Sequence, residues 1–268
     1  MLKEFLAQAL ELVVPPSCLA CYRALGPRTE HRSPATLLCD DCAAMMRPVD
    51  LAKACAYCGV SPHRPPKDLA LVDRCSECES LPPSFQQARS AFPYDSPAGA
   101  IVRNMKYQRA PFLAEYLVEY SSIVLDEWLG DICQRITVVP MPMSLRRQLH
   151  KGFNQAEELA RALAVKYHAQ VLREGVFHRT RTGSPQARFH THAERVSNVA
   201  DIFFVKRPEA VSGLSLLLVD DVMTTGATVG AAAKALIDAG AREVFVYTPV
   251  RARLGEDDGD ESESVRLD

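Results

Sequence analysis

The sequence lacks long hydrophobic runs, because none of its apolar segments approaches the about 18 consecutive residues that a membrane-spanning helix needs. The N-terminal segment is a poor secretion signal, since Lys3, Glu4 and Glu11 interrupt its apolar pattern and no small-residue cleavage site follows. Neither sign of charge dominates, because 31 basic and 33 acidic residues leave a net charge of −2. Together these absences favour a cytoplasmic protein without membrane insertion.

Large apolar residues are scarce between residues 18 and 78, so a hydrophobic core alone would struggle to fold this stretch. Cysteine is abundant there instead, in four C-x₂-C pairs, with 17 residues separating the first two pairs and 16 separating the last two. The eight cysteines are Cys18, Cys21, Cys39, Cys42, Cys55, Cys58, Cys75 and Cys78. Two residues between ligands allow a tight turn to direct both sulfurs at one tetrahedral ion. Each half therefore has the spacing of a four-thiolate zinc site.

The cysteine spacing predicts two zinc ions, the first held by the first four cysteines and the second by the remaining four. A cross-braced arrangement, in which alternate pairs share an ion, stays open. Redox-active pairs and reduced structural cysteines are further alternatives, whereas disulfides are disfavoured because nothing indicates an oxidising compartment. Four thiolates leave no open coordination position, so both zinc ions would be structural.

One stretch combines an apolar strand with two adjacent carboxylates. Residues 214–219 form an apolar run that ends at Asp220 and Asp221, and a helical pattern follows at 229–239. The loop between them holds Thr224, Thr225, Gly226, Ala227 and Thr228. Such a loop suits a phosphate, because the first N–H groups of a helix are unpaired, while the carboxylates suit sugar hydroxyls or Mg²⁺. A buried strand followed by an Asp-capped turn is the alternative.

Strands and helices alternate along the rest of the chain. Strands are predicted at 88–94, 136–139, 214–219 and 243–250, and helices at 97–107, 112–129, 153–167 and 229–239. This alternation predicts an α/β fold, with a parallel sheet flanked by helices and preceded by the small cysteine-rich region. Ligands bind such sheets beyond the carboxyl ends of the strands, so the loops 144–152 and 220–228 are expected to line one site.

Composition divides the chain into three parts. Residues 1–82 are predicted to hold an N-terminal helix and the cysteine-rich zinc region, and residues 83–253 the α/β domain. Residues 254–268 contain seven acidic residues against one basic residue, together with Ser and Gly. This composition predicts a disordered acidic tail, and screening of a basic nucleic-acid surface is an alternative role for it.

The stretch 216–228 resembles the 5-phosphoribosyl 1-pyrophosphate (PRPP) signature of type I phosphoribosyltransferases. In both, four apolar residues are followed by two acidic residues, two variable residues and Thr-Thr-Gly-x-Thr. The resemblance implies that Asp220 and Asp221 are the catalytic pair and hold the ribose hydroxyls, directly or through Mg²⁺. Residues Thr224 to Thr228 would then bind the 5′-phosphate.

Several other motifs are similar to those of the competence protein F (ComF) family. They are Lys106-Tyr107, Pro140-x-Pro142, Lys151-Gly152-Phe153-Asn154-Gln155, Gln186, Arg195 and Asn198. Members of this family, which includes a group named for gluconate utilisation, join an N-terminal zinc region, here a double zinc ribbon, to a type I phosphoribosyltransferase domain. Lys151 departs from the pattern, because members usually carry Arg there. The charge is kept but the bidentate phosphate fork is lost.

The ComF pattern implies a second half of the ligand site. Residues 140–144 would face the pyrophosphate of PRPP, with Arg146, Arg147 and Lys151 as its cationic surroundings. A solvated basic loop is the alternative for these three residues. Asn154 and Gln155 begin a helix, so helix capping competes with ligand contact as their role.

Basic residues exceed acidic ones between 143 and 195, which suits the phosphates of PRPP and also single-stranded DNA. Phe153, Phe177 and Phe189 would either stack on bases or pack in a core. The favoured function is that of a PRPP- and Mg²⁺-binding phosphoribosyltransferase acting in DNA uptake during natural transformation or in nucleotide metabolism. The alternative is a non-catalytic competence factor that binds single-stranded DNA and DNA-processing proteins, with a regulatory or vestigial PRPP site. No residue stands out as a base for the acceptor substrate.

Overall fold

The computed structural model describes residues 16–25, 37–61, 74–130, 135–143, 152–180 and 202–252. The predicted N-terminal helix and the acidic tail at 254–268 lie outside these ranges, and so do Arg146, Arg147 and Lys151. Among the described helices, none is long and apolar enough to cross a membrane.

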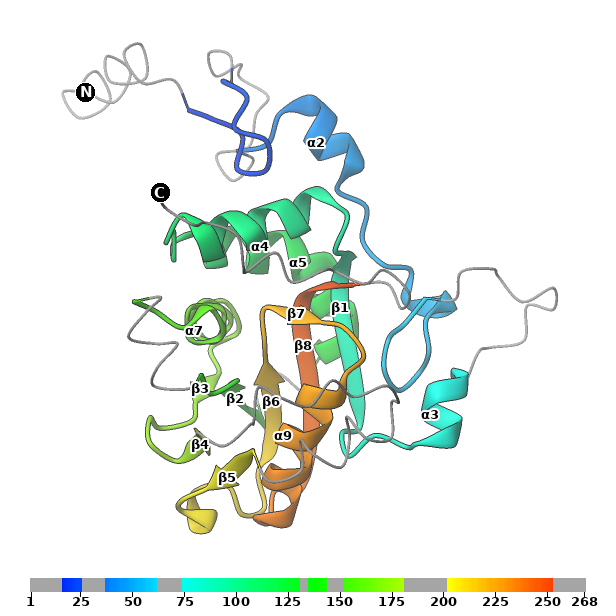
Figure 1. The fold of residues 1–268 in the computed structure, drawn as a ribbon, viewed down its shortest axis with the longest axis vertical. Coiled ribbons are helices and arrows are strands. Elements are labelled where there is room, and N and C mark those ends of the chain that lie inside the picture. The colour runs from blue at the N-terminus through cyan, green and yellow to red at the C-terminus, as the bar shows by residue number, and fades with distance from the viewer. Residues whose placement is uncertain are drawn as a thin grey trace, which may run out of the picture.

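The centre of the fold is a six-stranded sheet with the order β1-β8-β6-β2-β3, in which β7 pairs with the end of β8 (Figure 1). Its strands are β1 (Gln87–Pro93), β2 (Ile136–Pro140), β3 (Gln170–Val171), β6 (Ser215–Val219), β7 (Val222–Met223) and β8 (Glu243–Arg251). All of these described pairings are parallel. Parallel strands need crossover connections, and the helices supply them, so the predicted fold class is confirmed.

Helices cover both faces of this sheet. The helices of the sheet domain are α4 (Pro97–Tyr107), α5 (Leu113–Leu129), α7 (Gln155–Tyr167) and α9 (Ala227–Asp238). Along β6, Leu217 and Val219 pack in the core with α4, α5 and α7, whereas Leu216 and Leu218 pack in the core with α9. The uniform burial of β6 follows, because a strand covered on both faces is apolar on both.

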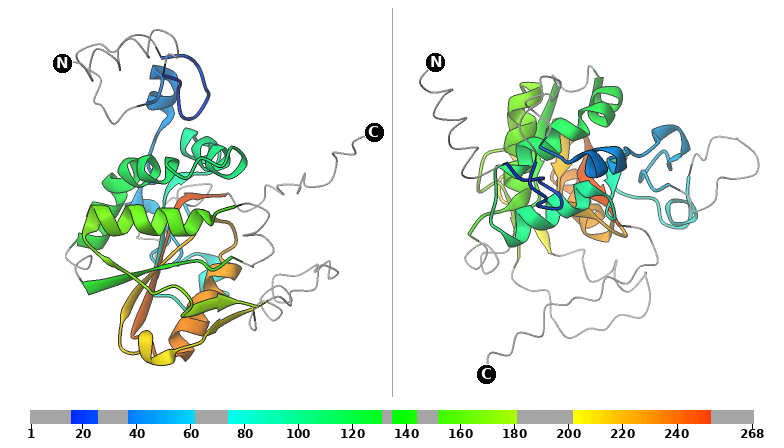
Figure 2. Two further views of the ribbon diagram at one scale, coloured as in Figure 1. Left: turned by 90° about the vertical axis from the view of Figure 1, so that its left-hand side faces the viewer. Right: turned by 90° about the horizontal axis from the view of Figure 1, so that it is seen from above.

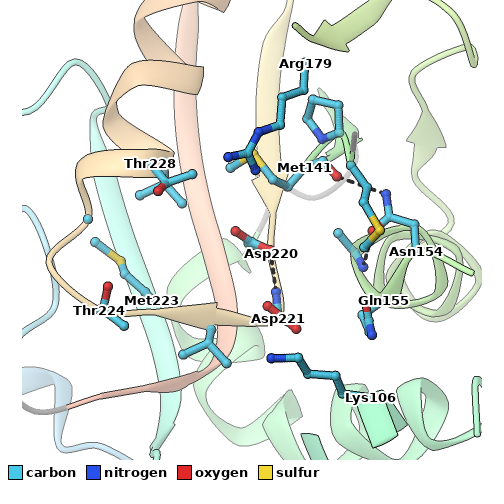
Figure 3. A pocket seen from close by; sticks show the side chains of 16 residues that line it. Lys106, Met141, Asn154, Gln155, Arg179, Asp220, Asp221, Met223, Thr224 and Thr228 are labelled. Atoms are coloured by element: carbon cyan, nitrogen blue, oxygen red, sulfur yellow. Dashed lines mark hydrogen bonds between the residues drawn. The ribbon is translucent and has the colours of Figure 1, made fainter. Parts of the chain in front are cut away.

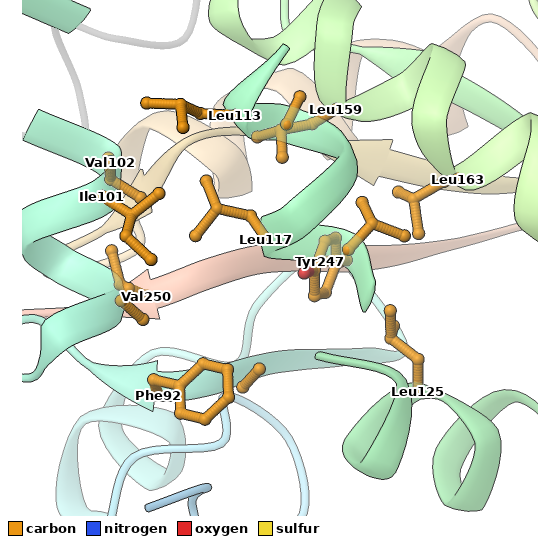
Figure 4. Close-up of a cluster of buried hydrophobic side chains, with 14 of the residues drawn as sticks. Phe92, Ile101, Val102, Leu113, Leu117, Leu125, Leu159, Leu163, Tyr247 and Val250 are labelled. Atoms are coloured by element: carbon orange, nitrogen blue, oxygen red, sulfur yellow. The ribbon is translucent and has the colours of Figure 1, made fainter. Parts of the chain in front are cut away.

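The two cores have different partners. Tyr247, Leu117 and Leu125 are fully buried in the α4–α5–α7 core (Figure 4). The α9 core also takes in an antiparallel pair formed by β4 (Phe177–Arg179) and β5 (Phe203–Val205). Figure 2 shows the helices α4, α5 and α7 toward one side of the sheet, and α9 with the β4–β5 pair toward the other.

The cysteines gather in two groups, which pack on different faces of the sheet. The first tetrad is Cys18, Cys21, Cys39 and Cys42, and the second tetrad is Cys55, Cys58, Cys75 and Cys78. Short helices lie among them, namely α2 (Asp40–Met45), which contains Cys42, the 3₁₀ turn Leu51–Lys53, which precedes Cys55, and α3 (Ser76–Ser80), which contains Cys78. The buried cysteines of the first tetrad belong to the α4–α5–α7 core, and those of the second to the α9 core.

The second tetrad is attached to β1, which lies at one edge of the sheet. The amide of Ala88 donates a 2.6 Å hydrogen bond to the carbonyl oxygen of Tyr57. Gly59, at φ +70°, brings its backbone so close to β1 that a Cβ there would lie 2.6 Å from the carbonyl oxygen of Ala88. This segment therefore covers part of an edge that would otherwise present unpaired backbone groups.

Candidate ligand site and metal centres

A cavity of about 260 Å³ opens beyond the carboxyl ends of β2 and β6 (Figure 3). Its walls come from five segments that are distant in sequence. They are Lys106, Met141–Met143, Asn154–Ala156, Arg179 and a stretch of the predicted loop that comprises Asp220–Thr224, Gly226, Thr228 and Val229. The cavity thus occupies the place where ligands bind parallel α/β sheets, and we call it the front cavity.

Asp220 and Asp221 lie where the chain leaves β6. The amide of Asp220 donates to the carbonyl oxygen of Tyr247 at 3.1 Å, which fixes its backbone against β8. The side chain of Asp220 then accepts a 2.9 Å hydrogen bond from the amide of Asp221. Both carboxylates line the front cavity, as the sequence predicts.

The surroundings of Asp220 disfavour its ionised form. Burial raises the pKa of Asp220 well above its usual range, and the negative charge of Asp221 adds to the shift. The guanidinium of Arg179 acts in the opposite direction. A ligand that brings a cation or hydroxyl donors to this pair would relieve the repulsion and favour the ionised form of Asp220.

The loop between β7 and α9 has a backbone geometry that suits a phosphate. Gly226 caps α9 at φ +84°, a conformation that suits glycine, and a Cβ there would meet the Cε atom of Met223 at 2.7 Å. Thr224, Gly226 and Thr228 line the front cavity at the N-terminus of α9. Unpaired N–H groups at such a terminus attract an anion.

Two residues of the predicted phosphate loop do not line the front cavity. Thr225 and Ala227 line a second cavity of about 330 Å³, which lies behind the loop and extends to Cys58 and Cys78 of the second tetrad. The hydroxyl oxygen of Thr225 accepts a 3.4 Å hydrogen bond from the amide of Ala227, so it supports the turn. We call this second space the rear cavity.

Asn154 and Gln155 have different roles, although both begin α7. The side-chain oxygen of Asn154 accepts from the amide of Ala156 at 3.1 Å, and its amide nitrogen donates to the carbonyl oxygen of Met141 at 3.0 Å. Asn154 is therefore a helix cap that also ties α7 to the end of β2. Gln155 is only 2% exposed, and its Nε2 atom has no hydrogen-bond partner among the described residues. A buried N–H donor of this kind on the wall of a cavity can form a hydrogen bond with a ligand.

Lys106 and Arg179 join the site without having been predicted as site residues. Lys106 comes from the last turn of α4 and extends toward Asp221 in Figure 3. Arg179 ends β4, where its guanidinium lies 5.5 Å from the ring centroid of Phe203. The ComF motif Lys106-Tyr107 could have identified Lys106 as a site residue. No motif separates Arg179 from the other basic residues around it in the sequence.

The predicted pyrophosphate side is described only in part. Met141, Pro142 and Met143 line the front cavity, so the loop expected to face pyrophosphate does reach it. Arg146, Arg147 and Lys151 lie outside the described residues. Phe177 is buried and stacked on Phe203, and Phe153 packs against the α4–α5–α7 core, which leaves core packing as their role.

Each cysteine tetrad has the geometry that a zinc ion requires. Zinc–sulfur bonds of about 2.3 Å in a tetrahedron place neighbouring sulfurs about 3.8 Å apart. The Sγ atoms of Cys21 and Cys39 are 3.7 Å apart, and those of Cys58 and Cys75 are 3.6 Å apart. All four sulfurs of each tetrad lie within 4.8 Å of one another. The pairing predicted from the sequence is thus the one that the fold brings together.

The pKa values of the thiols in the second tetrad also favour binding of a cation. The hydrogen bond from the Cys58 thiol lowers the pKa of Cys55 to about 4, so one member is ready to be a thiolate. Burial raises the pKa of Cys78 to about 12, which keeps it neutral in the absence of a cation. Zinc is the ion that four clustered thiolates prefer.

Comparison with known proteins agrees with the fold. The family model described as the phosphoribosyl transferase domain matches residues 149–266, which include the Asp220–Thr228 loop. A parallel sheet with this loop at the carboxyl end of β6 therefore defines a phosphoribosyltransferase-like protein that carries two cysteine tetrads.

The relatives narrow this class to one family. The chain is 32% identical to the DNA utilization protein YhgH of Escherichia coli over 65% of this chain and 75% of that protein. It is 29% identical to the YhgH protein of Salmonella typhi, over 88% of this chain and 97% of that one. It is 24% identical to the competence protein ComFC of Bacillus subtilis, over 88% and 95% of the two chains. The chain belongs to the ComF family, to which the sequence motifs pointed.

Proposed function

We propose that the front cavity binds PRPP together with Mg²⁺. The observation that carries this proposal is the convergence of two carboxylates, the N-terminus of α9 and the unpartnered amide of Gln155 on one cavity. Asp220 and Asp221 would hold the ribose hydroxyls, directly or through the metal. The loop Thr224–Thr228 would hold the 5′-phosphate.

The charges of the described wall suit both ends of this ligand. Mg²⁺ prefers carboxylate oxygen ligands and phosphate oxygens, and Asp220 with Asp221 offers the former. Lys106 and Arg179 are the cationic residues among the described parts of the wall, and they lie beside the carboxylates rather than in the phosphate loop. We infer that they, with Arg146, Arg147 and Lys151, face the pyrophosphate.

The reaction that such a site would serve is pentosyl transfer, in which an acceptor displaces pyrophosphate at the anomeric carbon. The residues of this chain would contribute by positioning PRPP and by stabilising charge on the departing pyrophosphate. A screen of acceptor nucleophiles that follows pyrophosphate release tests for turnover. Release that depends on an added acceptor supports an enzyme, whereas binding without release with any acceptor favours a regulatory site.

Binding itself is tested by calorimetry with PRPP in the presence and absence of Mg²⁺. We expect binding that requires the metal and that falls about tenfold or more in Asp221→Asn, which corresponds to about 1.4 kcal/mol. Ribose 5-phosphate and pyrophosphate, titrated separately, distinguish the two halves of the site. The absence of magnesium-dependent PRPP binding by the intact protein contradicts the proposal.

We further propose that the protein acts in DNA uptake or utilisation in the cytoplasm, where thiolate centres stay reduced. The names of its relatives support the DNA role. One exposed feature favours direct contact with single-stranded DNA. The side chain of Phe204 is 44% exposed and its ring stacks on His178, with the ring centroids 5.2 Å apart. Such an exposed aromatic pair can stack on bases.

The DNA proposal is tested with Phe204→Ala and a single-stranded oligonucleotide at several salt concentrations. We expect the affinity to fall with salt and to drop about tenfold in the variant. Phe112→Ala removes another ring, 57% exposed, from the start of α5, and serves as the matched control. Equal effects of the two variants, or affinity without salt dependence, rule out this surface.

Finally, we propose that each tetrad holds one structural zinc ion, within a region of residues 1–82 that comprises an N-terminal helix and a double zinc ribbon. The phosphoribosyltransferase domain then spans 83–253, and 254–268 is a disordered acidic tail. The sulfur distances in both tetrads support the zinc assignment. Metal analysis of the purified protein is expected to give about two zinc ions per chain.

A further inference from the structure

The second tetrad is surrounded by buried positive charge. Arg89 and Arg251 are 8% and 7% exposed, and neither forms a salt bridge with a carboxylate among the described residues. One guanidinium nitrogen of Arg251 donates to the carbonyl oxygen of Cys58, and another lies 3.8 Å from its Sγ atom. Burial lowers the pKa of Arg89, and the charges of Cys55 and Cys58 oppose that shift.

Two buried guanidiniums need a negative partner, since an uncompensated buried charge is costly. Four thiolates around a divalent zinc ion leave two negative charges in excess. Arg89 and Arg251 match that excess. The first tetrad differs, because Arg23 beside it has a side chain that is 65% exposed and is paired with Asp41. Among the residues that the structure describes, the buried cations therefore lie at the second tetrad.

Arg251 also reaches the phosphate loop. It ends β8, where it pairs in register with Met223 of β7, and the amide of Ala252 donates to the carbonyl oxygen of Met223 at 2.9 Å. A guanidinium nitrogen of Arg251 lies 3.3 Å from the Sδ atom of Met223. The side chain of Met223 is buried directly under Gly226, so close that a Cβ on Gly226 would touch it.

We propose that Arg251 is a positioning residue that couples zinc binding at the second tetrad to PRPP binding at the front cavity. The path runs from Cys58 through Arg251 and Met223 to Gly226. Loss of the zinc ion leaves Arg251 buried without its negative partner, so its contact with Met223 shifts and the loop loses the support that holds it open for a phosphate. This inference rests on the proposed PRPP site.

Thermodynamic linkage makes the coupling reciprocal: if zinc at the second tetrad strengthens PRPP binding, PRPP must strengthen zinc binding by the same factor. The full-length, zinc-loaded protein is exposed to a chelator with Mg²⁺ alone and with Mg²⁺ plus PRPP. Thiols freed by zinc loss are trapped by alkylation, and peptide mass spectrometry reads the two tetrads separately. We expect PRPP to slow alkylation of Cys55 and Cys58 by about fivefold or more, with Cys18 and Cys21 unaffected.

Three variants test whether the coupling runs through Arg251. Arg251→Met should speed zinc loss from the second tetrad, weaken PRPP binding and abolish the protection by PRPP. Arg89→Met removes a charge from the same tetrad without a contact to the loop, so it should speed zinc loss but leave the protection in place. Arg23→Met, at the first tetrad, should change neither PRPP affinity nor the second tetrad.

The wild-type measurement needs no variant to fold, so it decides the question even if Arg251→Met is unstable. Calorimetry on the same sample separates the two proposals. PRPP binding without selective protection of Cys55 and Cys58 overturns the coupling and leaves the ligand site intact. Equal protection of both tetrads also overturns it, because that result reports general stabilisation. The absence of PRPP binding overturns the proposed function, and the coupling with it.

Discussion

At the scale of single residues, the front cavity holds groups that contribute little to the stability of the ligand-free protein and that we propose to bind a ligand. Asp220 is the clearest case, because burial and the charge of Asp221 raise its pKa. A carboxylate whose folded-state pKa exceeds its unfolded value destabilises the protein above the folded pKa. That penalty disappears as the pH falls below the unfolded pKa. The arrangement that we propose for ligand binding at Asp220 therefore lowers the stability of the ligand-free protein.

Asp220→Asn should stabilise the ligand-free protein by about 1 kcal/mol at neutral pH, because it removes the repulsion. The gain over the wild type should shrink as the pH falls through the raised pKa of Asp220, because the wild-type carboxylate then takes up a proton. Urea unfolding of both proteins at several pH values measures the difference, and zinc loss in acid affects both alike. The same variant should lose magnesium-dependent PRPP binding. A variant less stable than the wild type at neutral pH would show that Asp220 serves the fold.

Gln155 and Asn154 allow a second test, since they are neighbours with opposite roles. Gln155→Leu removes the unpartnered Nε2 donor, so stability should be unchanged or higher while PRPP affinity falls about tenfold. Asn154→Ala removes a helix cap and should cost about 1 kcal/mol of stability. Thermal unfolding and calorimetry on both variants check this division. Unchanged PRPP affinity in Gln155→Leu contradicts a ligand contact.

At the scale of elements, the junction between β7 and α9 depends on one glycine. Gly226→Ala places a methyl group against Met223 at a positive φ, so it should lower PRPP affinity and cost about 1–3 kcal/mol of stability. Gly230 lies one turn later in α9, where an added Cβ meets no atom within 4 Å. Gly230→Ala should therefore stabilise the helix by about 0.5–1 kcal/mol with PRPP binding intact. Denaturant unfolding and calorimetry of the pair test the cradle geometry. Similar effects of both substitutions would refute it.

Much of the element order could be predicted, because local patterns determine it. The helix predicted at 97–107 is α4 with the same bounds, and the strand predicted at 243–250 is β8 with one further residue. The spacing of the cysteines favoured the grouping that the fold brings together, but it left a cross-braced arrangement open, which only the tertiary structure decides. The strands β4 and β5 had no such pattern, because each is three residues long and their pairing joins segments far apart in sequence.

Only the part of the candidate site that lies within one sequence motif could be predicted. Their strand–loop–helix context predicts the role that we propose for Asp220, Asp221, Thr224, Gly226 and Thr228, which are consecutive or nearly so in the sequence. Lys106, Gln155 and Arg179 reach the same cavity from three other elements. Their convergence depends on tertiary packing, which no local pattern encodes. Nothing in the sequence indicated that Thr225 and Ala227 would face the rear cavity instead.

At the scale of the whole molecule, the sheet separates the two tetrads. The first tetrad packs with α4, where the Nδ2 atom of Asn104 donates to the carbonyl oxygen of Leu19 at 2.8 Å. The second packs behind the phosphate loop and along β1. Because thiolate-bound zinc contributes folding free energy, each ion should stabilise the face of the sheet on which it lies.

This separation predicts different local effects for two matched cysteine variants. Cys42→Ser and Cys78→Ser each remove one buried ligand, so each should lower the zinc content from about two ions per chain to about one. In hydrogen exchange, Cys42→Ser should raise the exchange of α2 and α4 amides, because α2 contacts α4, while α9 keeps its protection. Cys78→Ser should raise exchange in the segment around Cys55–Gly59, at β1 and at the start of α9. Identical exchange patterns in the two variants, or loss of both ions from either one, would contradict independent centres, because one cooperative zinc unit would respond as a whole.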